Sequence, residues 1–220
     1  MLIVNTQLVF VGVLMRELCI LTKSLKDKGY CVVGADTTTG ELYRLVNDEE
    51  GTAVPKEVMD NKQIETLDVI HVNLTKHVPV NCQTENWMFD ENSIVKFGSL
   101  GLNDVLRLHP ANNADFIFDN NKTELTTDET SKLKHSIEIA EVSHVKLDTS
   151  LKGDGRNHHK LKFKYHGNDY ALSLTDPKLR QENFDRFPLG KATVVVSIPS
   201  HPYGENNSFH KFAAKVFVHL

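Results

Sequence analysis

The sequence predicts an all-β fold made of two consecutive units. Short runs rich in β-branched and aromatic residues recur along the chain, separated by Gly, Asn and Asp turns, as is typical of sandwiches and barrels. Long amphipathic helices are scarce, and no internal repeat is visible. The length of 220 residues is enough for one large domain or two small ones, each with its own core.

The first unit is predicted to span residues 16–100. Its strands are expected at residues 18–22, 30–36, 41–46 and 67–74, where apolar and β-branched residues concentrate. Thr37 to Gly40 supplies the glycine of a tight hairpin between the second and third of these strands. Residues 1–15 lack the basic region and small-residue cleavage site of a signal peptide. Met15 would serve as a natural start, so we expect residues 1–15 to form a disordered N-terminal extension.

The second unit is predicted to span residues 101–220, with strands at 136–148, 160–165, 170–175, 192–198 and 211–219. Three lysines, Lys160, Lys162 and Lys164, alternate with Leu161, Phe163 and Tyr165. This period of two places the apolar side chains on one face of a strand and the ammonium groups on the other. The stretch at residues 93–135 is the one expected to hold short helices, with a cap at Thr127 and Asp128.

The lysine-rich strand has two possible interpretations. The formal net charge is -4, so any attraction to phosphate must come from a local patch. One reading is a surface that contacts a nucleic-acid backbone, with Tyr165 or Tyr170 stacking on bases. The other is the solvated face of an antiparallel strand, where lysines discourage edge-to-edge aggregation.

The sequence carries no recognised catalytic pattern, so we expect a protein that is not an enzyme and has no cofactor or metal. There is no G-x-S-x-G elbow, no phosphate-binding loop and no dinucleotide-binding glycine motif. His158 and His159 are adjacent, and adjacent strand residues point to opposite faces, which disfavours a shared metal. Three cysteines without C-x-x-C spacing favour a reducing, cytoplasmic compartment, and no run is long enough to cross a membrane.

Two positions in the first unit combine charge with apolar surroundings. Arg44 lies in the strand run at residues 41–46, and a charge among apolar neighbours needs partners, so we expect Glu85 beside its guanidinium. Glu85, Asn86 and the single tryptophan, Trp87, follow in a segment without strand periodicity. This cluster either locks the two units together or lines a pocket.

These runs resemble the bacterial dual OB-containing domain family. The resemblance is carried by residues 18–24, Lys26, residues 29–34 and 40–46, and by Glu85, Asn86 and Trp87. Weaker matches lie at residues 170–177, 194–198 and 211–214. The resemblance implies two OB-like five-stranded barrels in one compact chain, with short connecting helices and a suspected role in nucleic-acid recognition.

Two functions remain open at this point. The first is a binding module for single-stranded DNA or RNA, or for a nucleotide. Its contacts would come from Lys23, Lys26, Tyr43, Arg44, Lys160, Lys162, Lys164, Tyr165 and Tyr170. The second is a protein-interaction or regulatory module, in which Arg44, Glu85, Asn86 and Trp87 only stabilise the contact between the barrels.

Overall fold

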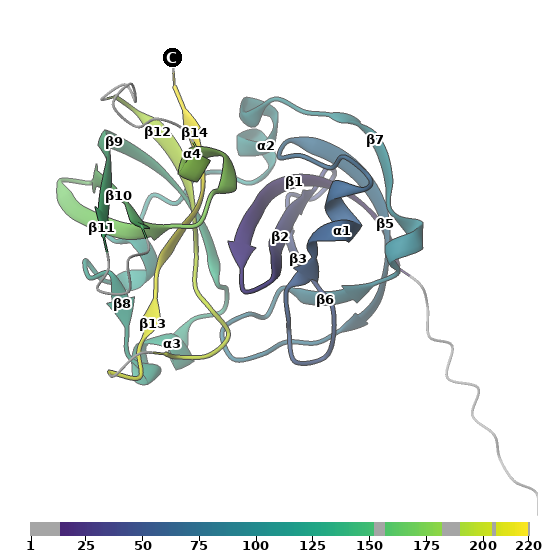
Figure 1. Ribbon diagram of the computed structural model, residues 1–220, viewed down its shortest axis with the longest axis horizontal. Helices are drawn as coiled ribbons and strands as arrows, with labels where there is room; N and C mark the ends of the chain where they lie inside the picture. The colour runs from purple at the N-terminus through teal and green to yellow at the C-terminus, as the bar shows by residue number, and fades with distance from the viewer. Residues whose placement is uncertain (1–13, 152–156, 182–189, 204–205, 220) are drawn as a thin grey trace, which may run out of the picture.

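Two β barrels lie side by side in the structure, a computed structural model (Figure 1). It describes residues 14–151, 157–181, 190–203 and 206–219. Strand β1 begins at Leu14, inside the extension predicted for residues 1–15, and Leu14 pairs with Leu74. Residues 1–13 lie outside the described part of the chain.

The first barrel is a ring of five strands in the order β1-β2-β3-β6-β5, closed by pairing of β5 with β1. Its strands are β1 (Leu14–Lys26), β2 (Gly29–Asp36), β3 (Leu42–Val46), β5 (Asp68–His77) and β6 (Asn86–Phe89). The β3–β6 pair is parallel and the other pairs are antiparallel. Two further strands join the edges, β4 (Val54–Pro55) beside β2 and β7 (Val95–Ser99) beside β5.

The second barrel repeats this topology strand for strand. Its closed order is β10-β11-β14-β12-β9, and only the β11–β14 pair is parallel. The strands are β9 (Ile137–Leu151), β10 (Asn157–Tyr165), β11 (Asn168–Leu174), β12 (Ala192–Ser197) and β14 (Phe212–Val218). In each barrel the first strand therefore pairs with the second and fourth, and the third with the fifth, which confirms the two predicted five-stranded barrels.

Short helices connect these strands. They are α1 (Lys56–Asp60), η1 (Glu91–Ser93), α2 (Leu102–Leu108), η2 (Ile117–Asp119), α3 (Thr127–Lys132) and α4 (Pro177–Gln181). A small sheet pairs β8 (Glu124–Leu125) with β13 (Phe209–His210). The helix α3 is capped by Thr126, one residue before the predicted cap, because Glu129 completes a capping box with it. No helix in the described residues is long and apolar enough to cross a membrane.

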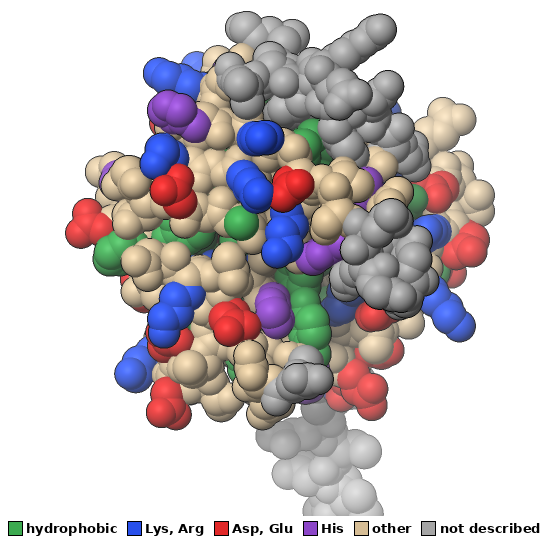
Figure 2. Space-filling view, turned by 60° about the vertical axis from the view of Figure 1, so that its left-hand side comes forward, with side chains coloured by type: hydrophobic (Ala, Val, Ile, Leu, Met, Phe, Trp, Pro, Cys, Tyr) green, Lys and Arg blue, Asp and Glu red, His purple; other side chains and the backbone are tan. Residues whose placement is uncertain are grey.

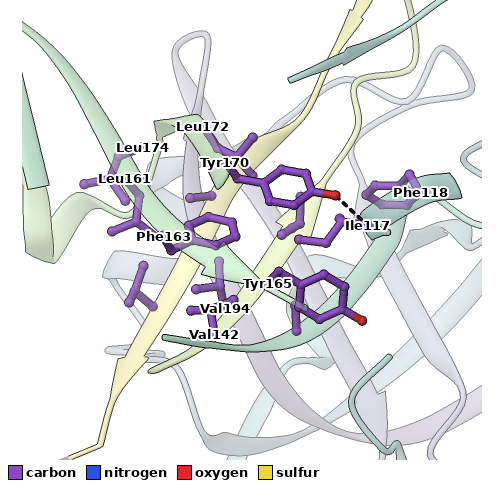
Figure 3. Packing of buried hydrophobic residues seen from close by; sticks show 14 of the residues in the cluster. Ile117, Phe118, Val142, Leu161, Phe163, Tyr165, Tyr170, Leu172, Leu174 and Val194 are labelled. Carbon is purple, nitrogen blue, oxygen red and sulfur yellow. Dashed lines mark hydrogen bonds between the residues drawn. The ribbon is translucent and has the colours of Figure 1, made fainter. Parts of the chain in front are cut away.

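Each barrel has its own core. Leu161, Phe163 and Tyr165 point into the second barrel, as their alternation predicts, and Figure 3 shows them packed with Tyr170 and Leu172. The first barrel is filled from its own strands by a separate cluster that includes Leu18, Ile20, Val32, Tyr43 and Leu45. Each barrel therefore has a core of its own, and Cys82 of the first unit also packs in the core of the second barrel.

A third cluster joins the barrels. It packs Cys19 and Val33 of the first barrel against Ile139 and Val195 of the second. Strand β2 contributes to two clusters, with Val32 in its own barrel and Val33 at the junction, and all its residues are buried. A strand that is covered on both faces has a continuous run of apolar residues, and this explains why the sequence of β2 shows no alternation of apolar and polar residues.

Strand β6 was missed by the sequence analysis. It has only four residues, begins with the fully buried Asn86, and shows no alternation of buried and exposed side chains. Its pairing with the distant strand β3 makes it a strand, and local sequence gives no sign of that contact. The predicted boundary near residue 100 stays a prediction, since Leu100 packs in the cluster between the barrels.

Candidate functional site

The outward face of β9, β10 and β11 carries the predicted lysine row, and we call it the lysine face. Lys160, Lys162 and Lys164 alternate on β10 with the buried core residues. The strand register places Lys146 and Asp148 beside them on β9, and Asp169 and Ser173 beside them on β11. Figure 2 brings this side of the molecule forward and shows basic side chains interspersed with acidic ones.

Ion pairs neutralise part of this face. The Lys162 Nζ lies 2.6 Å from Asp148 Oδ2, and the Lys164 Nζ lies 3.0 Å from Asp169 Oδ1. The hydrogen bond from Lys162, helped by the charges of the neighbouring lysines, holds the pKa of Asp148 below its usual range. Lys160 has no hydrogen-bond or ion-pair partner among the described residues. With Lys146 included, four lysines face two aspartates, so the lysine face is locally positive in a chain of net charge -4.

An aromatic platform continues the lysine face at one end. Lys160 pairs with Ser173, and Ser173 pairs in turn with Phe212 of β14, so the three side chains share one face of the sheet. Tyr203 stacks on Phe212 and on His210, at 6.0 and 4.8 Å between ring centroids, and its residue surface is 45% exposed. An exposed ring beside a row of ammonium groups is the combination that single-stranded nucleic acids contact.

Tyr165 and Tyr170, expected as stacking residues, lie elsewhere. Both are buried in the core of the second barrel, and their hydroxyl groups bind backbone oxygens, that of Tyr165 at Asn112 and that of Tyr170 at Asn120 (Figure 3 shows the rings). A base could reach either ring only by opening that core, so base stacking by these two side chains does not fit the structure.

The binding residues predicted in the first barrel form hydrogen bonds within the protein itself. The buried Lys23 donates to Glu65 Oε1 at 2.9 Å, to Asp60 Oδ1 at 3.2 Å and to a backbone oxygen. Lys26 donates to the Gly51 carbonyl at 2.9 Å, and its burial lowers its pKa. Tyr43, also buried, donates to Glu41 and so offers no open ring for stacking.

Arg44 is the centre of the contact between the barrels. It is 1% exposed, and its Nη2 donates to Glu85 Oε1 at 3.0 Å, which confirms the predicted partner. The same guanidinium donates to Ser136 and Ser197 of the second barrel, at 2.6 and 3.4 Å from Nη2. Arg44 and Glu85 therefore connect the two barrels by charge-assisted hydrogen bonds, as the interface hypothesis expects.

The remaining predicted residues support this junction. Asn86 is fully buried and donates to Gln83 Oε1 at 3.2 Å, and Gln83 donates to the Ile198 carbonyl of the second barrel at 2.9 Å. Trp87 is half-buried and stacks on His77, with 4.8 Å between ring centroids. Lys26 and Arg44 also line a cavity of about 470 Å³ between the barrels, and Tyr203 is another of its lining residues.

Comparison with protein families agrees with this architecture. The model of the dual OB-containing domain family matches residues 16–216. The chain belongs to this family. No curated protein matches the sequence significantly.

Several solved structures resemble this dual OB chain at low sequence identity. The p204 HINb domain is 11% identical with a TM-score of 0.42, and the match covers 89% of this chain and 91% of that one. A murine DNA-binding protein bound to double-stranded DNA is 8% identical, with a TM-score of 0.39 and coverage of 94% and 96%. The Ifi202 HINa domain in complex with a 20-bp double-stranded DNA is 12% identical, with a TM-score of 0.38 and coverage of 94% and 97%. At these scores the likeness carries no conclusion about the ligand of the dual OB chain.

Tyr203 is the site residue that sequence reasoning missed. It lies far along the dual OB chain from the lysines, in the connection between β12 and β14, and it reaches the lysine face only through the β11–β14 pairing. One feature of the sequence could have identified Tyr203, because it is an isolated aromatic residue between Pro202 and Gly204. An aromatic side chain in a Pro/Gly loop has no strand periodicity to bury it.

Proposed function

We propose that this chain is a non-enzymatic nucleic-acid-binding module that holds a single strand along the lysine face. Lys160, Lys162 and Lys164 contact phosphates, and the Tyr203 ring stacks on a base at the end of the row. The observation that carries the proposal is the row from Lys160 through Ser173 and Phe212 to the exposed Tyr203. Cations that follow a backbone and a ring that accepts any base are what sequence-tolerant binding to single strands needs.

The position of this row within the barrel supports the proposal. OB barrels commonly bind oligonucleotides across their second and third strands and the adjoining loops. In the second barrel these strands are β10 and β11, and their outward side chains are accessible. In the first barrel the equivalent strands β2 and β3 are covered by the second barrel, which leaves one open face of this kind in the described structure.

A charge-reversal experiment tests the phosphate contacts. The variant carries Lys160→Glu, Lys162→Glu and Lys164→Glu, and binding to a labelled single strand is measured by fluorescence polarisation across a salt series. We expect wild-type log affinity to fall linearly with log salt, by about 0.7 for each phosphate contact, and the variant to lose binding. The control reverses Lys76, Lys122 and Lys132, which are exposed and lie off the lysine face, with the same change in net charge.

A second experiment tests the aromatic platform. Tyr203→Ala should weaken binding to a single strand by about 1–3 kcal/mol, whereas Tyr203→Phe, which keeps the ring, should leave it nearly unchanged. Double-stranded DNA offers no open base, so its affinity should not depend on Tyr203. If wild type binds no oligonucleotide even at low salt, the lysine face is a solvated surface, and the protein-interaction hypothesis replaces this one.

A further inference from the structure

A second cavity between the barrels has a different chemistry. Its volume is about 740 Å³, its lining includes Glu85, and it shares no lining residue with the cavity lined by Arg44. Four carboxylates line it, those of Glu41, Glu85, Asp119 and Glu138, together with the single ammonium group of Lys134. We call it the acidic pocket.

Glu85 lines this pocket, and one of its carboxylate oxygens has no hydrogen-bond partner among the described residues. Its side chain is 8% exposed, and its Oε1 accepts hydrogen bonds from Arg44 and Ser136. Its Oε2 is buried without a hydrogen-bond partner among the described residues. A buried carboxylate oxygen without a donor is costly, and an N–H group of a ligand would relieve that cost.

Other groups at the wall leave the pocket negative. Burial lowers the pKa of His109, whereas the hydrogen bond that His135 donates to Glu138 raises the pKa of His135. Among the residues that line the pocket, the four carboxylates face the Lys134 ammonium group and, when it is charged, the His135 imidazolium. The lining alone therefore carries two negative charges, or three when His135 is neutral. Arg44 lies behind the lining at Glu85, and Lys211 interacts with Asp119 and Glu138. His77 is occupied by a backbone oxygen, that of Thr84, at 2.6 Å.

Trp87 provides an aromatic wall. Its indole lines the pocket and is braced from one side by the stacked His77 ring, 4.8 Å away between centroids. A cation is attracted to the face of a tryptophan ring within about 6 Å of its centroid, more strongly than to other aromatic rings. Carboxylates and a tryptophan around one cavity are the groups that recognise ammonium and guanidinium ions.

We propose that the acidic pocket is a second binding site of this protein, for a cationic amine or guanidinium group. The group is carried either by a free amine or by a lysine or arginine side chain of a peptide. Glu85 and Asp119 accept hydrogen bonds from it, and Trp87 packs on it. A nucleic-acid phosphate is repelled by the same carboxylates, so this site is separate from the lysine face and does not depend on the function proposed above.

The test uses the fluorescence of Trp87, the only tryptophan of the chain. The full chain is titrated with agmatine, as a free amine, and with a short peptide containing one arginine. The same peptide with citrulline in place of arginine is the uncharged control. We expect a saturable change in Trp87 fluorescence with at least one of the two cations and none with the citrulline peptide, and the responding arm identifies the source of the cation.

Two variants connect the response to the pocket without touching the buried Arg44–Glu85 pair. Glu41→Gln with Asp119→Asn should weaken cation binding by roughly fivefold for each charge removed, because a unit charge about 4 Å away contributes about that factor in water. Asp115→Asn, an exposed acid of the same loop that does not line the pocket, should leave it unchanged. Equal responses to arginine and citrulline peptides, equal affinity of the double variant, or no response to either cation would overturn the proposal.

Discussion

The second strand of the first barrel is buried on both faces, whereas the second strand of the second barrel is buried on one. Strand β2 has no exposed residue, because its outward side chains pack against β9 and β12. Strand β10 alternates, with lysines outward and core residues inward. Two barrels of one topology thus differ in exposure, because the second strand is covered on its outer face in the first barrel and open in the second.

Two cations, one from each barrel, differ in the same way. Arg44 of the first barrel is satisfied by Glu85, Ser136 and Ser197 and holds the barrels together. Lys160 of the second barrel has no partner among the described residues and remains available to a ligand. A positively charged residue in an OB barrel is therefore informative about binding only when its face is known to be open.

Breaking the junction should have the largest effect. Arg44→Met leaves the carboxylate of Glu85 buried without its charged partner, which should destabilise the fold by about 3–5 kcal/mol. Arg16→Met is the matched control, because Arg16 is part-exposed and lies 3.7 Å from Asp36, so its loss should cost about 1 kcal/mol or less. Urea denaturation of both variants checks this, and equal midpoints would show that Arg44 does not hold the barrels together.

Lys211 is a buried cation of the second barrel, and among the described residues its hydrogen bonds go to uncharged oxygens. Its Nζ donates to the Ile117 carbonyl and to both oxygens of Asn120, so Lys211→Met should destabilise the fold by about 2–3 kcal/mol through unsatisfied acceptors. Circular dichroism in urea at pH 7 measures this. An unchanged midpoint would mean that these oxygens find other donors.

The lowered pKa of Lys211 should also change how the free energy of unfolding depends on pH. Burial lowers the pKa of Lys211 from 10.5 to about 8, so between these two values the unfolded chain binds more protons than the folded one. The contribution of Lys211 to the free energy of unfolding should therefore rise with pH across this range, so wild type should gain stability relative to Lys211→Met. The thiols of Cys19 and Cys82, whose pKa burial raises to about 12 and about 11, act in the opposite direction in both proteins. Parallel pH profiles of the two proteins would contradict the lowered pKa.

The hairpins that follow the two second strands offer a matched pair of glycines. Gly40 and Gly167 both have positive φ, 74° and 83°, so alanine at either position is expected to cost about 1–2 kcal/mol of backbone strain. A Cβ at Gly40 would also lie 2.2 Å from the Leu108 carbonyl oxygen, whereas one at Gly167 has open space. Thermal denaturation should thus show a greater loss for Gly40→Ala than for Gly167→Ala, and the reverse order would argue against the close packing of the first hairpin.

Removing an acid from the lysine face should tighten binding, the smallest effect considered. Asp148→Asn frees Lys162 and deletes a charge that repels phosphate, so affinity for a single strand should increase by up to about fivefold at low salt. The gain should shrink at high salt because exposed charges are screened. Fluorescence polarisation measures it, with Asp115→Asn as the control, and a loss of affinity would mean that Asp148 itself contacts the ligand.

Much of the fold could be predicted from local patterns. The alternation of Lys160 to Tyr165 gave the orientation of β10, and the isolated charge of Arg44 among apolar residues pointed to Glu85. In both cases the information lies in the chain itself, as a period of two or as a charge that needs a partner.

The parts that failed depend on contacts between distant segments. Tyr165 and Tyr170 carry the residue type of a stacking site, yet strand alternation had already placed Tyr165 inward with Phe163. Tyr203 reaches the lysine face only because β14 pairs with β11, and the alternation of a single strand says nothing of its neighbours. The burial of β2 on its second face likewise arises from the other barrel.

Mapping of lysine reactivity with and without an oligonucleotide tests most directly whether the second barrel carries the open surface. Reductive methylation followed by mass spectrometry reports each lysine separately. We expect Lys160, Lys162 and Lys164 to react readily in the free protein and to be protected by a saturating single strand, while the buried Lys23 reacts slowly in both states. Unchanged reactivity of these three lysines in the bound protein, or protection confined to lysines of the first barrel such as Lys76 and Lys96, would contradict the assignment.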